Sequence, residues 1–150
     1  MVFSNIVVAV DGSTASQEAV DHAVDLARHS NAVLTGIFIL DSQWPDFIGN
    51  DWQSSKGARQ GFLDHIRVEQ EEQAAAARAQ FESASGGLEH ATFHVHAGDP
   101  TDVLIEQANS DKTDLLITSR RVFQVSGRPS LKALGTTLAR KALRPILLLP

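Results

Sequence analysis

The sequence predicts an α/β fold: a doubly wound, five-stranded parallel sheet in the order 3-2-1-4-5, with helices on both faces. Apolar runs alternate with helical patterns along the 150 residues, and such alternation is typical of right-handed crossovers between parallel strands. The first run, Ile6 to Val10, is continuously apolar and β-branched, as in strands covered on both faces. With this length and no cysteine, we expect one domain, 1–150, that needs no disulfide or metal to fold.

The first strand ends at the turn signal Asp11-Gly12-Ser13, and a helix is expected to follow as far as about His29. Thr14 and Gln17 fit a capping box at its start. One face of this helix carries small apolar side chains, which would let it lie close to the sheet: Ala19, Val20, Ala23, Val24 and Ala27.

The second strand is predicted over Ala32 to Leu40. The stretch 41–61 contains Pro45, three glycines and scattered aromatic residues, so we expect a long loop with little regular structure. Its aromatic side chains either form a lid or anchor the loop to the body of the protein. Apolar residues at helical spacing then predict a helix over 62–84, ended by Ser85-Gly86-Gly87.

The third strand, 91–97, alternates in polarity, with His90, Thr92, His94 and His96 on one face. Histidines at this spacing can hold a metal ion when a carboxylate lies near. An edge strand with one solvated polar face produces the same pattern. We predict no metal site, although His94 and His96 are the side chains to examine.

Gly98-Asp99-Pro100 marks the start of the next helix, with Asp99 as N-cap and Pro100 at the first helical position. A fourth strand follows Asp114. Thr136 or Thr137 is expected to cap a short last helix that includes Leu143, and the apolar run Ile146–Leu149 is the fifth strand. The Gly135-Thr136 pair either only caps this helix or also lets a ligand approach its N-terminus, where free N–H groups suit an anion.

Charge is distributed unevenly along the chain. The net charge of −5 argues against general binding to nucleic acid or to an anionic membrane. All charged residues after Asp114 are basic, so this last segment carries +7 and residues 1–114 carry −12. The four cations expected in the loop, Arg120, Arg121, Arg128 and Lys132, either attract a small anion or are simply solvated.

The predicted strand order places the topological switch point between the first and fourth strands. Ligands of doubly wound sheets bind at the carboxyl ends of the strands at this point. We therefore expect a crevice between Asp11-Gly12 and the segment from Thr118 to Thr137. No apolar run approaches membrane-spanning length and no secretory leader pattern precedes the first strand, so we expect a cytoplasmic protein.

Four stretches together form a recognisable pattern: 6–13, 97–100, 114–117, and Gly135-Thr136 followed by a helix, a proline and the terminal strand. In these the chain resembles the universal stress protein family over its whole length. The resemblance implies a Rossmann-like fold of the adenine nucleotide α-hydrolase kind and a cytosolic protein of the stress response. Some members bind ATP and others do not. It also implies a homodimer, commonly through the last strand, here Ile146–Leu149, whose apolar edge itself needs covering.

In ATP-binding members of that family, the fourth strand leads into glycine, two residues, glycine, nine residues, and glycine with serine or threonine. Here Thr118 stands at the first glycine position and Arg121 at the second, and thirteen residues separate Arg121 from Gly135. Gly127 lies within this longer segment, out of register with the pattern.

The resemblance assigns a nucleotide, ATP or AMP with or without Mg²⁺, to specific residues. Asp11 would lie near the adenine and ribose, Ile39 against the base, and Gly135, Thr136 and Thr137 at the phosphates. Thr118, at the first glycine position, and Arg120 join these candidates. The extra arginines either replace missing backbone contacts to phosphate or bind nothing.

Three functions follow as hypotheses. The first is a nucleotide-binding regulatory module, and the second is a nucleotide-free dimer that acts through protein–protein contacts. The third is an enzyme, but the sequence contains no dinucleotide fingerprint, Walker loop, nucleophile elbow or HExxH motif. We therefore predict no enzymatic activity, with slow ATP hydrolysis as the form it would take if present.

Overall fold

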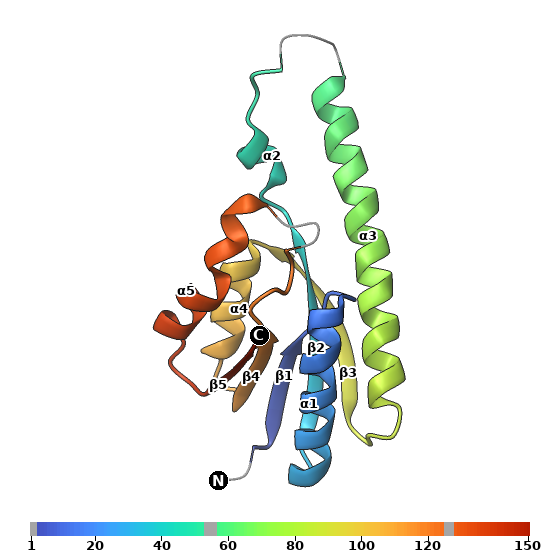
Figure 1. Ribbon diagram of the computed structural model, residues 1–150, viewed down its shortest axis with the longest axis vertical. Helices are drawn as coiled ribbons and strands as arrows, with labels where there is room; N and C mark the ends of the chain where they lie inside the picture. The colour runs from blue at the N-terminus through green and yellow to red at the C-terminus, as the bar shows by residue number, and fades with distance from the viewer. Residues whose placement is uncertain (1–2, 53–56, 125–127) are drawn as a thin grey trace.

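The computed structural model describes residues 3–52, 57–124 and 128–150. It contains the predicted five-stranded, all-parallel sheet in the order β3-β2-β1-β4-β5 (Figure 1). The elements follow one another as β1 (Asn5–Ala9), α1 (Thr14–Ser30), β2 (Val33–Asp41), α2 (Trp44–Ile48), α3 (Ala58–Ser85), β3 (Ala91–Gly98), α4 (Pro100–Ala108), β4 (Leu115–Ser119), a 3₁₀ turn η1 (Pro129–Ala133), α5 (Leu134–Lys141) and β5 (Ile146–Leu149).

Helices cover both faces of the sheet. α1 and α3 pack together on one face, and α4 and α5 pack together on the other (Figure 1). Connections that leave β1 and β4 therefore run to opposite faces, which opens the switch point between these two strands, as predicted. β1 is fully buried from Ile6 to Ala9 apart from slight exposure of Val7.

Close approach of α3 to the sheet depends on Gly36 of β2. A Cβ atom at this position would lie 2.5 Å from the Phe81 ring of α3, so only glycine leaves room for that ring. Phe81 is itself 1% exposed and packs on Phe93 of β3, with 5.8 Å between the ring centroids. This contact fixes the body of α3 against the outer half of the sheet.

The prediction of an irregular loop over 41–61 is wrong in part, because residues Trp44–Ile48 form α2 and α3 begins at Ala58. Pro45 stands in the first turn of α2, where its missing N–H costs nothing. Gly57 takes the left-handed conformation just before α3. Gly61, one of the glycines that favoured a loop, lies inside α3. Residues 53–56 of this stretch lie outside the described residues.

α3 has 28 residues, which corresponds to about 42 Å of helix. Its N-terminal part and α2 project together beyond the carboxyl ends of the strands (Figure 1). The aromatic side chains of the stretch pack on one another and on α3: Trp44 contacts Phe47 and Phe62, and Trp52 contacts Phe62. This packing agrees with the interpretation that they anchor the segment.

Besides the start of α3, two predicted helix starts are wrong by one or more residues. Ser13, not Thr14, is the N-cap of α1, and its side chain accepts from the Ser16 N–H at 3.2 Å. Neither Thr136 nor Thr137 caps α5, which begins at Leu134 directly after η1. Pro129 starts this 3₁₀ turn and shifts the helix start upstream, so that Gly135 and Thr136 lie within the first turn.

The start of α4 is confirmed, whereas the end of α5 is not. Asp99 is the N-cap of α4, with its Oδ2 atom accepting from the Asp102 N–H at 3.1 Å, and Pro100 is the first helical residue, as predicted. α5 ends at Lys141, so the predicted extension to Leu143 is wrong, and Leu143 is 84% exposed. The observed strand limits agree with the predicted ones to within about a residue.

β3 is an edge strand, as the order requires, and Thr92 and His94 are exposed. The rings of His94 and His96 lie 6.5 Å apart between centroids. Among the described residues, no three His, Cys, Asp or Glu side chains gather as a set of metal ligands. No helix in the described part of the chain is both long and apolar enough to cross a membrane.

Candidate functional site

The turn after β1 and the segment after β4 lie side by side, as the switch-point argument predicts. The Asp11 side chain joins them: its Oδ2 atom accepts from the Phe123 N–H at 2.8 Å, and its Oδ1 atom accepts from Ser13 N–H at 2.9 Å and from the Ser13 hydroxyl. Asp11 is 2% exposed. Both carboxylate oxygens are therefore occupied by groups of the chain itself.

Phe123 fills the end of the crevice where the resemblance places the base. Its ring is 3% exposed and meets Phe38 edge-on, with 5.7 Å between centroids. Phe123, Leu131 and Ile39 line the same small cavity together with Asp41, Gln70, Gln73 and Pro100. The cavity has a volume of about 10 Å³, which is room for one water at most. Ligand sites for small molecules usually have about 300–1,000 Å³.

Arg128 closes the same end through two ion pairs. Its Nε atom donates to Asp41 Oδ2 at 2.7 Å, and its Nη2 atom donates to Asp99. The side chains of Arg128 and Asp41 are 10% and 4% exposed, and that of Asp99 is 22% exposed. Burial lowers the pKa of Arg128, but the hydrogen bonds and charges of Asp41 and Asp99 outweigh burial and raise this pKa overall. We call this group of three side chains the latch.

The other end of the crevice is open and basic. A pocket of about 230 Å³ lies between the end of β4 and the first turn of α5, lined by Arg120, Arg121, Gln124, Gly135 and Thr136. A Cβ atom at Gly135 would lie 3.1 Å from Arg120 Cγ, so glycine lets this arginine lie against the helix. Two guanidinium groups beside the start of α5 suit a phosphate.

Two other candidate residues do not line this pocket. Thr118 is 0% exposed in β4, and its hydroxyl donates to Ser119 O at 3.1 Å. Thr137 is half-buried one residue beyond Thr136. In this conformation, the structure thus brings together Arg120, Gly135 and Thr136 and leaves Thr118 and Thr137 aside. Gly127 lies outside the described residues.

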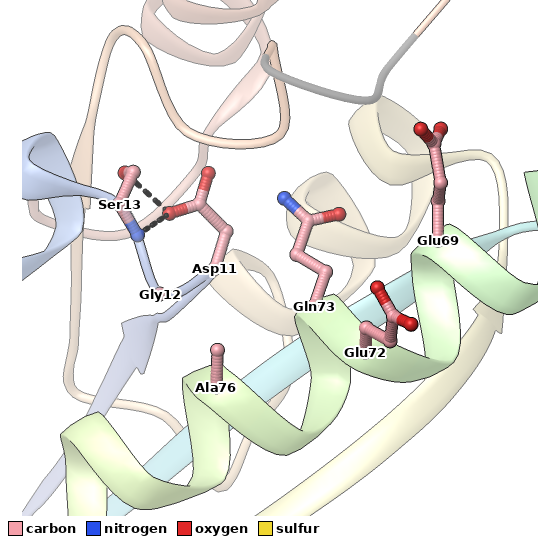
Figure 2. A pocket seen from close by; sticks show the side chains of 7 residues that line it. All are labelled: Asp11, Gly12, Ser13, Glu69, Glu72, Gln73 and Ala76. Carbon is pink, nitrogen blue, oxygen red and sulfur yellow. Dashed lines mark hydrogen bonds between the residues drawn. The ribbon is translucent and has the colours of Figure 1, made fainter.

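A further pocket, of about 390 Å³, opens beside Asp11 on the α3 side. Figure 2 shows the turn Asp11-Gly12-Ser13 facing the α3 side chains that complete the lining: Glu69, Glu72, Gln73 and Ala76. Gly12 has a φ of 82°, and a Cβ atom there would lie 3.0 Å from Ala76 Cβ. Three carboxylates make this pocket acidic, so it would repel phosphate. Sequence reasoning missed it because α3 faces the turn from a distant part of the chain.

Comparison with known proteins decides the family. The family model described as "Universal stress protein family" matches residues 3–148. The chain belongs to the universal stress protein family. No curated protein matches the chain significantly in sequence.

Solved structures of other universal stress proteins share this fold. The universal stress protein UspA from Lactobacillus plantarum superposes with a TM-score of 0.74 at 19% identity, over 100% of this chain and 99% of that chain. A universal stress protein in complex with cAMP gives 0.58 at 22% identity, over 100% and 98%. The universal stress protein from Archaeoglobus fulgidus in complex with dAMP gives 0.61 at 15% identity, over 100% of both chains.

Proposed function

We propose that this chain is a regulatory module of the universal stress protein family that binds an adenine nucleotide, ATP or AMP, at the switch point between β1 and β4. The observation that carries the proposal is the basic pocket at the first turn of α5. There, the guanidinium side chains of Arg120 and Arg121 line one pocket together with Gly135 and Thr136 at the start of α5. Complexes of two other universal stress proteins with cAMP and dAMP support an adenine nucleotide as the ligand.

The charges on the two sides of the crevice favour one orientation of the nucleotide. The phosphates would lie in the basic pocket at Arg120 and Arg121, away from the acidic pocket beside Asp11. The base would then approach Ile39 and the ribose would approach Asp11. Among the described residues no carboxylate lines the basic pocket, so Mg²⁺ would arrive with the triphosphate rather than be held by the protein. The residues present therefore fit the phosphates, whereas Phe123 stands in the way of the base.

The second candidate is a nucleotide-free stress protein that acts through protein–protein contacts. The filled space at Phe123 favours it, because a cavity of about 10 Å³ leaves no room for a base. The projection of α2 and α3 offers exposed apolar side chains to a partner, with Phe47 48% and Val68 46% exposed. Both candidates are regulatory, and we propose no catalysis for either. Undetectable release of phosphate from ATP over hours would agree with this.

In either case we propose a cytoplasmic homodimer formed through β5. This strand is at the edge of the sheet, and its four residues, Ile146–Leu149, are apolar and only partly buried in the single chain. An apolar edge strand of this kind is a template for pairing with a second copy.

A thermal-shift experiment separates the two functions. A ligand present at a hundredfold its Kd adds about 2.7 kcal/mol to the free energy of unfolding, which is about 5–11 °C in Tm for a domain of this size. We expect such a shift with millimolar ATP and Mg²⁺. The double variant Arg120→Gln, Arg121→Gln should reduce it sharply, and Arg140→Gln, an exposed arginine outside the pocket, should not. No shift in the wild type, together with no adenine absorbance in protein purified without nucleotide, would favour the nucleotide-free function.

A further inference from the structure

We propose that Phe123 is an internal plug for the base half of the nucleotide site, and that the Arg128 latch holds this plug in place. Base binding and the observed position of Phe123 then exclude each other. The inference rests on the proposed function, because it concerns regulation of the same site. It adds that the resting protein is self-inhibited toward nucleotides but stays open to phosphate alone.

The first argument is that Phe123 occupies both the space and the hydrogen-bonding group that a nucleoside would need. Its ring contributes to filling the space beside Ile39, where about 10 Å³ remains. Its backbone N–H donates to Asp11 Oδ2, while the Ser13 N–H donates to Asp11 Oδ1. The carboxylate proposed to receive a ribose hydroxyl is therefore already bonded on both oxygens and is 2% exposed, so little of it faces a ribose while Phe123 stays in place. One residue both fills the volume and bonds the group that would receive the ribose.

The second argument comes from backbone conformation. Phe123 has a φ of 65°, in the left-handed region, which a bulky side chain rarely adopts. A residue stays in such a conformation only where its surroundings over-determine it. Here the Asp11 hydrogen bond and the edge-on contact with Phe38 do so. Release of the plug would relieve this conformation, which lowers the cost of opening.

The third argument concerns the latch. Arg128 follows Phe123 by five positions and binds Asp41 at the end of β2 and Asp99 at the start of α4. Asp41 lines the same small cavity as Phe123. Phe123 is thus bound to Asp11 on one side of the crevice, and Arg128 is bound within the latch on the other. Weakening the latch should raise the open fraction, and apparent nucleotide affinity rises in proportion to that fraction.

The test measures binding of two probes by calorimetry: ATP, and inorganic tripolyphosphate, which has no base. Phe123→Ala removes the ring but keeps the N–H that binds Asp11. Asp99→Asn keeps one oxygen, which can cap α4, and replaces the oxygen that binds Arg128 by an NH2 group, which cannot accept a hydrogen bond. Phe93→Ala is the matched control, because it removes the same ring from β3, where Phe93 packs on Phe81 and Arg78.

Removal of a buried phenylalanine ring should raise ATP affinity about tenfold or more. We expect this for Phe123→Ala, a smaller increase for Asp99→Asn, and no change for Phe93→Ala. Tripolyphosphate should bind the wild type and all three variants with affinities within about twofold, since its pocket lies outside the plug. In wild-type protein, hydrogen exchange at the Phe123 amide should be slow without ligand and become fast with ATP, but not with tripolyphosphate. This readout requires no variant.

Two results would overturn the inference in distinguishable ways. Equal ATP affinity in the wild type and Phe123→Ala, with the Phe123 amide still protected when ATP is bound, would show that the base binds without displacing the plug. The proposed function would survive that result. Absence of binding by ATP and by tripolyphosphate in every protein would remove the proposed function itself, and the plug with it.

Discussion

Replacement of Arg128 by leucine tests the latch directly, because it removes one cation from between two carboxylates. Asp41 is the more demanding partner. Its side chain is 4% exposed, and after the substitution its Oδ1 atom would keep the Gln43 N–H at 3.0 Å while Oδ2 would lose the 2.7 Å contact with Arg128. Leucine fills part of the vacated volume but brings no donor.

The magnitude follows from how well each carboxylate can regain water. Breaking a buried ion pair by removing one partner costs about 3–5 kcal/mol. Asp99 is 22% exposed and keeps the Asp102 N–H, so it regains water readily and places the cost near the lower limit. We expect Arg128→Leu to lose about 3 kcal/mol, which corresponds to about 6–12 °C in Tm for a domain of this size.

Urea unfolding followed by far-UV circular dichroism measures this loss, with calorimetry for Tm. Arg140→Leu is the control, because Arg140 is exposed on α5, and it should stay within about 0.5 kcal/mol of the wild type. The double variant Asp41→Asn, Arg128→Leu should regain about 1 kcal/mol or more, because it no longer buries an unpaired charge.

A loss below about 1 kcal/mol for Arg128→Leu would place the latch among ordinary surface ion pairs and refute the reasoning. A full loss without recovery in the double variant would show that Arg128 acts through packing of its stem rather than through its charge.

Three further predictions concern other parts of the molecule. Gly12→Ala should lower the free energy of unfolding by about 1–3 kcal/mol, because φ is 82° and the new methyl group would lie 3.0 Å from Ala76 Cβ. Gly61→Ala, in open space within α3, should raise the free energy of unfolding by up to about 1 kcal/mol. Urea unfolding measures both. The pKa of Arg128 is raised on folding, so its charge stabilises the folded state fully at every pH below the pKa of arginine in the unfolded chain. Between about pH 6 and 9 Arg128 stays charged, so its titration should not change the difference in unfolding free energy between the wild type and Arg128→Leu. Leu147→Lys in β5 should convert the proposed dimer to a monomer in light scattering, and an unchanged mass would exclude β5 as the interface.

Much of the fold could be predicted because its signals are local. The β-branched run Ile6–Val10 and the pair Asp99-Pro100 each report on a few neighbouring residues, and topology rules then place the strands. The meeting of Asp11 with the segment after β4 also follows, since it depends on strand order alone. The positions of individual side chains at the site did not follow in the same way.

The loop cations show why. Sequence reasoning gave the four loop cations the same two alternatives, anion binding or solvation, and named only Arg120 as a nucleotide contact; the structure separates Arg120 and Arg121 from Arg128. Arg120 and Arg121 line the basic pocket, whereas Arg128 is paired within the protein. Its partner Asp41 lies 87 positions away in the chain, and no local pattern encodes such a pairing. The left-handed conformation of Phe123 is equally invisible, because it results from tertiary contacts rather than from residue type.

If Phe123 acts as the proposed plug, the two candidate functions are two states of one equilibrium. In this proposal, opening the base half breaks the Asp11–Phe123 hydrogen bond. Because Arg128 is bound to Asp41 only five positions further along the chain, we expect the two restraints to oppose opening together. With both in place, the protein presents a phosphate-sized basic pocket and no base site. With both released, Asp11 Oδ2 and the space beside Ile39 become available at once. Variants of the latch should therefore move the protein between nucleotide-free and nucleotide-binding behaviour without any change at the phosphate pocket, and a latch variant that altered tripolyphosphate binding would contradict this separation.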